Sequence, residues 1–295
     1  MLAIILALAS AIGYGGSDFA AGLASRSAGV IQVTLLASAV SALVVTAALP
    51  FAASHPPTTA ALVWGAVAGL GGTMGALALY LGFRHAAFSV AGPISAVGAA
   101  GFSVLAGLLL GERPTALALT GIVLALPAIV GVSASAASAG GRSDEPAEDP
   151  AAAAGRPIAG AAAGLVAGAC FALLFIGLDR AGSGSGLWPV AATQVAELAV
   201  ALAVAVATRN VRLPGSRPRL LAAITGAAGA AGTILFFFAT HEGFLAVTAV
   251  LTSLYPAVTI VLARTVLGER LTVLRLAGLV LAGGCVSLIA VGGSG

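Results

Sequence analysis

VLAGLLLGERPTALALTGIVLA, residues 104–125, returns as VLARTVLGERLTVLRLAGLVLA at residues 261–282. The two stretches align without a gap at an offset of 157 residues, and 14 of their 22 positions are identical. Such a match exceeds chance even in a chain this rich in Ala, Leu, Val and Gly. The chain therefore contains an internal duplication, which in hydrophobic proteins is the usual construction of secondary transporters.

The composition is that of an integral membrane protein. Apolar residues make up 60% of the chain and charged residues only 8%, whereas soluble domains carry roughly 25% charged residues. Lysine is absent, so all 13 basic residues are arginines. They form no basic stripe interleaved with aromatic residues, which argues against a nucleic-acid partner. The small share of charged residues excludes a water-soluble domain of this length.

Ten apolar runs are long enough to cross a bilayer, which takes about 20 residues of helix. Backbone groups in lipid must be satisfied within each segment, so the runs predict an all-α integral membrane protein with ten transmembrane helices. The predicted spans are 2–23, 29–49, 60–82, 88–109, 115–135, 158–178, 186–207, 219–240, 244–266 and 272–292.

The spans divide into two five-helix repeats, residues 1–135 and 158–295, joined by a flexible linker at 136–157. The linker is rich in Ala, Ser, Gly and Pro and holds four acidic residues, as expected of a solvated segment. Because five is an odd number, the second repeat must enter the bilayer from the opposite side. This predicts an inverted-topology repeat.

The arginines predict the orientation. With ten spans, eleven arginines fall on the side of the linker and two, Arg113 and Arg180, fall on the side of the termini. The positive-inside rule then makes the linker cytoplasmic and places both termini outside. We expect a multi-pass protein of a bacterial-type plasma membrane.

Several kinds of chemistry have no support in the sequence. Cys170 and Cys285 lie in apolar runs without metal-ligand spacing, the three histidines are scattered, and there is no Walker, HExxH or Gly-x-Ser-x-Gly motif. We expect no bound cofactor, no metal site and no catalytic residues. The expected partners are a small-molecule substrate, the lipid bilayer and protons, with the chain acting as a monomer or a weak homodimer.

Two kinds of motif resemble a known family. Gly111-Glu112-Arg113 and Gly268-Glu269-Arg270 end the fourth span of each half, and GYGGSDFAAGLASR at residues 13–26 resembles a first-helix signature of a bacterial subgroup. Ten spans in two halves with these motifs resemble the EamA-like transporters of the drug/metabolite transporter superfamily. The likeness covers the whole chain except the linker.

This resemblance implies a basket of helices around a central cavity that opens alternately to each side. It implies transport of amino acids, other metabolites, nucleotide sugars or drugs, more often by efflux. Many members are drawn with cytoplasmic termini, and the arginine distribution here predicts the reverse. We read the Gly-Glu-Arg motifs as structural turns, with gating contacts as the alternative.

Glu197 is the outlier among the membrane residues. It lies about ten residues from either end of its span, or roughly 15 Å along a helix, and so at the bilayer midplane. A charge there is costly unless it faces a cavity or a partner. Gln194, one turn earlier, is on the same face and can share a hydrogen bond. We interpret both as candidates for substrate binding or coupling, with Glu197 as the group that could carry a proton, the alternative being a protonated Glu197 that merely bonds a neighbouring helix.

Asp18 in the first span shares a helix face with Tyr14. The functional interpretation is a substrate or cation contact on the cytoplasmic side. The structural alternative is an ion pair with Arg26, Arg84 or another arginine of that side.

A further polar group follows in the ninth span. Pro256 removes an amide donor and frees a carbonyl one turn earlier, which is typical of disturbed helices at transporter sites. Pro93 is a second helix-break candidate, in the fourth span, although the 157-residue offset does not align it with Pro256. The candidate substrate contacts are Thr252, Ser253 and Tyr255 of this span, together with Tyr80 of the third span, with helix packing, or anchoring of the tyrosines at lipid headgroups, as the alternative.

The sequence thus predicts a secondary transporter, in the exporting direction, of a small organic solute such as an amino acid, a metabolite or a drug, with proton coupling or exchange. The alternative, a membrane-embedded enzyme or flippase for a lipid or polyprenyl carrier, would need a convergent polar cluster near one membrane face. The polar residues here are sparse and dispersed.

Overall fold

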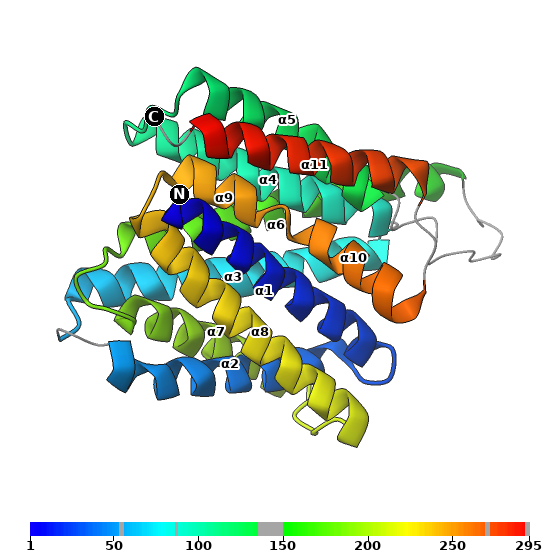
Figure 1. The fold of residues 1–295 in the computed structure, drawn as a ribbon. Coiled ribbons are helices and arrows are strands. Elements are labelled where there is room, and N and C mark those ends of the chain that lie inside the picture. The colour runs from blue at the N-terminus through cyan, green and yellow to red at the C-terminus, as the bar shows by residue number, and fades with distance from the viewer. Residues whose placement is uncertain (53–55, 86–87, 135–149, 269–271, 293–295) are drawn as a thin grey trace.

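The computed structural model describes residues 1–52, 56–85, 88–134, 150–268 and 272–292. Within these ranges the chain forms helices and no strand (Figure 1). The helices are α1 Leu2–Ser25, α2 Val30–Ala52, α3 Thr59–His85, α4 Phe88–Leu109, α5 Ala116–Ala134, α6 Pro150–Arg180, α7 Trp188–Ala207, α8 Ser216–His241, α9 Leu245–Thr252, α10 Tyr255–Leu267 and α11 Val273–Gly292.

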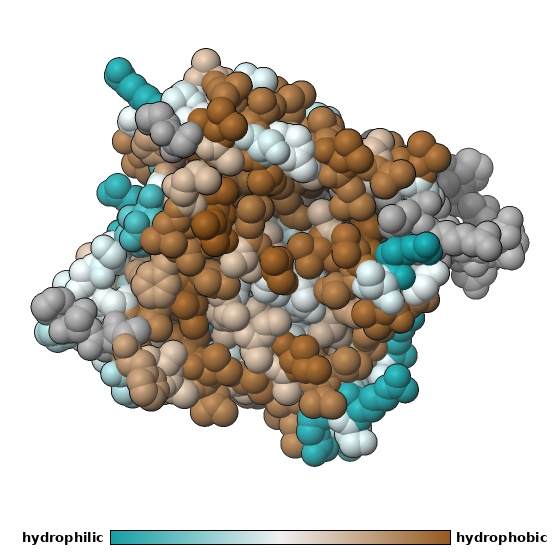
Figure 2. Space-filling model, viewed as in Figure 1, coloured by the Kyte–Doolittle hydropathy of each residue, from teal (hydrophilic) through white to brown (hydrophobic). Residues whose placement is uncertain are grey.

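Seven helical stretches of the described chain are long and apolar enough to cross a membrane, and α9 and α10 together make one of them. Three shorter apolar stretches, Ile94–Leu109, Ala116–Gly131 and Leu276–Gly292, lie at predicted spans. Figure 2 shows a broad hydrophobic band with hydrophilic groups gathered toward the two ends of the helices. The protein is therefore a multi-pass membrane protein.

The helices differ from the predicted spans at three places. The predicted span 244–266 is two helices, because the chain leaves the helix after Thr252 and α10 starts at Tyr255. Conversely, α4 runs through Pro93 without interruption, so the prediction of a break there is wrong. Pro93 lies in the second turn, where its ring costs one backbone bond without ending the helix.

The third difference concerns the linker. Helix α6 begins at Pro150, inside the predicted segment 136–157. The alanine run that follows has a high helix propensity, and proline is well tolerated in a first turn, so a helix is favoured there.

The main pairings between the two halves occur in symmetric couples. Helix α1 packs along α8 as α6 packs along α3, α2 packs on α8 as α7 packs on α3, and α5 packs with α11 (Figure 1). These pairs exchange under the 157-residue offset. Ser10 and Ser17 bond to Gly232 and Thr225 respectively, so α1 and α8 are antiparallel.

Close packing of small residues holds these pairs together. A side chain at Gly13 would lie 2.8 Å from the Cα of Gly232, so the backbones of α1 and α8 are in direct contact there. In the other half Gly71 packs on the carbonyl of Cys170, the residue that the 157-residue offset aligns with Gly13. Gly168 likewise packs on the α4 backbone. These glycines therefore serve helix contacts within one chain, as small residues do in lipid.

Candidate functional site

One face of α1 is fixed to α8 by three hydroxyl groups. Ser10 donates to the carbonyl of Gly232 at 2.8 Å, and Ser17 donates to the carbonyl of Thr225 at 2.9 Å. Between them, Tyr14 Oη lies 3.0 Å from Thr233 Oγ1. Since the single Thr233 hydroxyl proton is given to the Gly229 carbonyl, Tyr14 is the donor in this bond.

A neighbouring face of α1 packs on α10. Gly15 leaves no space for a side chain against Val258 and the carbonyl of Tyr255, and its own carbonyl accepts a bond from Thr259 at 3.1 Å. Asp18 follows Tyr14 by four residues and Gly15 by three, so its side chain lies between these two faces. It is directed into the helix bundle rather than toward lipid.

Asp18 is nevertheless exposed, because it borders an open space. Among the described residues no hydrogen bond or ion pair is formed by its carboxylate. Arg26 therefore does not neutralise it, and the side chain of Arg84, the other arginine considered, lies outside the described part of the structure. The carboxylate is available to a solute.

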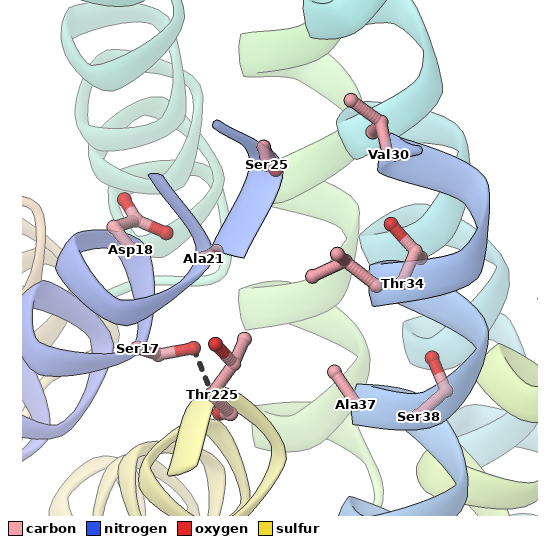
Figure 3. A pocket seen from close by; sticks show the side chains of 10 residues that line it. Ser17, Asp18, Ala21, Ser25, Val30, Thr34, Ala37, Ser38 and Thr225 are labelled. Carbon is pink, nitrogen blue, oxygen red and sulfur yellow. Dashed lines mark hydrogen bonds between the residues drawn. The ribbon is translucent and has the colours of Figure 1, made fainter. Parts of the chain in front are cut away.

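The open space is a pocket of about 140 Å³ between α1, α2 and α8 (Figure 3). Side chains of α1 and α2 line its two sides and Thr225 of α8 lines its floor. Its polar lining consists of one carboxylate and five hydroxyl groups, from Ser17, Asp18, Ser25, Thr34, Ser38 and Thr225.

Sequence reasoning missed the hydroxyls that α2 and α8 contribute. Thr34, Ser38 and Ser41 recur at helical spacing on one face of the second span, and this periodicity was the signal that could have found them. Ser41 donates to Gln194 Oε1 of α7 at 2.8 Å. Gln194 is therefore engaged with α2, and no described bond joins it to Glu197.

Glu197 reaches the same interior from α7. Its Oε1 lies 2.6 Å from the position that a Cβ would take at Gly72, so the absence of a side chain on α3 makes room for the carboxyl group. The described structure gives Glu197 no hydrogen bond or ion pair. Tyr14 is within electrostatic range of both Glu197 and Asp18, and Tyr255 is within range of Asp18. Tyr14 thus senses the charge of both carboxyl groups.

The break between α9 and α10 brings Tyr255 within electrostatic range of Asp18. Tyr255 and Pro256 form the first turn of α10, while Thr252 is buried and bonds weakly to the carbonyl of Ala7, at 3.4 Å. Ser253 is buried with no partner for its hydroxyl among the described residues. Of the predicted contacts in this span, only Tyr255 is brought near a carboxylate. The side chains of Tyr80 and Pro93 lie outside the described part.

The first Gly-Glu-Arg motif has a different role. The Glu112 carboxylate accepts the backbone N–H groups of Leu245 at 2.5 Å and Ala246 at 2.9 Å, and so caps the N-terminus of α9. Gly111 supplies the left-handed turn, with φ of 94°. Burial raises the pKa of the Glu112 carboxyl, outweighing the opposing effect of these two bonds. Glu269 and Arg270 lie outside the described residues.

The described residues contain no cluster of three or more metal-ligating side chains. The sequence model of the EamA-like transporter family matches the chain twice, at residues 1–134 and 158–291. The chain belongs to the EamA-like transporter family. Its two repeats are thus the two copies of the family's unit, and the resemblance to the EamA-like transporters is confirmed.

Solved structures were compared with this chain, and their likeness bears on its fold. A crystal structure described only as that of a protein superposes with a TM-score of 0.71, at 18% sequence identity over 96% of each chain. This identity is low enough that the likeness supports the fold alone. No curated protein sequence matches the chain significantly.

Proposed function

We propose that this EamA-like protein is a secondary transporter that exports a small organic solute, an amino acid, a metabolite or a drug, by alternating access with proton coupling or exchange. The observation that carries this proposal is the pair of carboxyl groups, Asp18 and Glu197, that face the bundle interior without a described partner. Ionisable groups within a membrane are energetically unfavourable, and they typically mark solute and proton pathways.

The fold supports a ten-span inverted repeat. Helix α1 is antiparallel to α8, whereas α7 runs parallel to α3 because Gly65, Gly69 and Gly72 meet Pro189, Thr193 and Glu197 in the same order. Both directions agree with an odd number of spans per half, as in repeats related by a pseudo-two-fold axis in the membrane plane, the architecture of many alternating-access transporters.

The proposed orientation places both termini outside. In Figure 1 the start of α1 and the end of α11 lie at one end of the bundle, and the end of α1 and the α7–α8 turn lie at the other. Arg26, Arg209 and Arg212 belong to this second end, which the positive-inside rule makes cytoplasmic. The pocket lies between the last turns of α1 and the first turns of α2, and so in the cytoplasmic half. We assign the conformation to an inward-facing state.

The test is solute flux in proteoliposomes. The purified protein is first screened by thermal shift against amines, amino acids and nucleosides. The compounds that bind are loaded into the proteoliposomes, and their flux is followed with and without a pH gradient. We expect gradient-dependent flux that Glu197→Gln abolishes and Glu242→Gln, an exposed outer-end control, retains. Full gradient-driven flux in the Glu197→Gln protein would show that Glu197 does not couple transport to protons.

A further inference from the structure

The hydroxyl groups around Asp18 restrict which solutes the pocket can bind. We infer that the pocket binds a small protonated amine with a short apolar substituent and without a carboxylate. This inference rests on the proposed transport function and names the substrate class of that site. It follows from which pocket atoms still have a proton to donate.

Two hydroxyl groups beside Asp18 already donate their only proton to backbone carbonyls. Ser17 donates to the carbonyl of Thr225, and Thr225 Oγ1 donates to the carbonyl of Leu221, both at 2.9 Å. Each hydroxyl oxygen can therefore only accept a further bond. Together with the Asp18 carboxylate they present acceptors from two helices, α1 and α8 (Figure 3).

An ammonium group has the complementary chemistry, because it carries three donors and no acceptor. Its bonds to a carboxylate are charge-assisted and stronger than neutral ones. An interior carboxylate without a described counter-ion favours a cation for the same reason.

A carboxylate on the solute has no comparable partner. The pocket lining includes no arginine, lysine or histidine. The donors left for an anion are the neutral hydroxyls of Ser25, Thr34 and Ser38, for which the described structure gives no bond. Transfer of a carboxylate from water to such a site is unfavourable without a cationic partner. A plain amine should therefore bind better than the corresponding amino acid.

A second, apolar pocket adjoins the first and shares Val30 and Thr34 with it. Its remaining lining is largely aliphatic and comes from α2, α3 and α7, namely Ile31, Thr73, Ala76, Leu77, Ala201 and Val204. Its volume is about 30 Å³, enough for a small alkyl end. Both volumes are well below the roughly 300–1,000 Å³ of sites for drug-sized ligands. These small volumes suit an ammonium head with only a short chain.

A matched series tests this. Binding of n-butylammonium, n-butanol, butyrate and norvaline, which is butylamine with a carboxylate on its first carbon, is measured by calorimetry on the purified full-length protein at pH 7.5. We expect n-butylammonium to bind best. Asp18→Asn should weaken its binding about 10- to 100-fold, the usual range for a bond to a charged group. Glu242→Gln, which removes a charge from the exposed outer end, should leave binding unchanged.

A second variant covers the case in which Asp18→Asn does not fold. Thr225→Val keeps the shape of the side chain and removes one acceptor, and it should weaken n-butylammonium binding severalfold without changing n-butanol binding. Equal or tighter binding of n-butanol, butyrate or norvaline would overturn the inference, as would unchanged amine binding by either variant.

Two results separate this inference from the proposed function. If norvaline is transported in an Asp18-dependent manner and n-butylammonium does not bind, the amine preference is wrong and the transport function stands. If n-butylammonium binds through Asp18 while no solute crosses the membrane under any gradient, the site stands and the transport function is wrong.

Discussion

The carboxylate of Glu112, which ends the fourth span of the first half, accepts the backbone N–H of Leu245 in the second half at 2.5 Å. It accepts that of Ala246 as well, so one side chain caps a buried helix of the opposite repeat. Every residue of α9 is buried, and its first N–H groups would otherwise lack partners. The first Gly-Glu-Arg motif therefore joins the two halves of the bundle.

Removing this cap should destabilise the protein. Replacing Glu112 by alanine leaves two N–H groups at the start of α9 without an acceptor, at a cost of about 1–2 kcal/mol, the usual value for a helix cap. Thermal unfolding in detergent measures the change. Glu242→Ala, which removes an exposed carboxylate near the same end, should have little effect. Equal melting temperatures for the two variants would show that the cap is dispensable.

The same carboxyl group predicts a pH effect. Because burial raises the pKa of Glu112, the folded protein takes up this proton at a higher pH than the unfolded chain does. Its contribution to stability is then complete below the unfolded pKa, about 4.3, and is lost as the pH rises through the folded value. The melting temperature of the wild type relative to Glu112→Gln should rise as the pH is lowered from 7 to 5. A constant or falling difference would contradict this.

Gly72 should matter for transport rather than for folding. An added methyl group would lie 2.6 Å from Glu197 Oε1, so Gly72→Ala must displace the carboxyl group, which is a flexible side-chain end. We expect reduced flux with a nearly unchanged melting temperature. Gly16→Ala is the matched control, because a methyl group there meets no atom within 4 Å. Similar flux in the two variants would argue that the position of the Glu197 carboxyl is unimportant.

Gly13 should behave in the opposite way. A methyl group there meets the backbone of Gly232 at 2.8 Å, and a backbone cannot move aside as a side chain can. Gly13→Ala should cost about 1–3 kcal/mol, as overpacking does, and lower the melting temperature, again with Gly16→Ala as the control. An unchanged melting temperature would show that α1 and α8 can move apart without loss of stability.

The sequence predicted most of the fold because lipid removes the alternatives to helix. Apolar runs and the breaks between them located nearly every helix within a few residues, and the doubled Gly-Glu-Arg segment identified the repeat. The sequence alone could not predict that Glu112 caps α9, because this contact joins residues more than 130 positions apart and depends on how the halves pack. Likewise, composition favoured a linker where the alanines after Pro150 continue into α6.

The site was predicted less completely. Asp18, Glu197 and Tyr14 stood out because charged and hydrogen-bonding groups are rare within spans. Thr34, Ser38 and Thr225 did not, since a hydroxyl on a membrane helix can equally bond to its own backbone, as Thr225 does. Gln194 illustrates the limit of helical spacing: it shares a face with Glu197 but bonds to Ser41 on another helix.

The proposed orientation can be checked by labelling. In a background without Cys170 and Cys285, a cysteine at the exposed position Gly184 in the α6–α7 turn should react with a membrane-impermeant maleimide in intact cells. A cysteine at Asn210, in the α7–α8 turn, should react only after the membrane is opened. The reverse pattern would place the termini in the cytoplasm.

The most direct measurement is flux of a solute that binds the purified protein, followed in proteoliposomes across a pH gradient for wild type, Asp18→Asn, Glu197→Gln and Glu242→Gln. We expect flux driven by the gradient in wild type and Glu242→Gln, at least about tenfold less in Asp18→Asn, as expected for loss of a bond to a charged group, and no response to the gradient in Glu197→Gln. Full gradient-driven flux in both carboxyl variants would contradict the central claim that these two interior carboxyl groups carry transport.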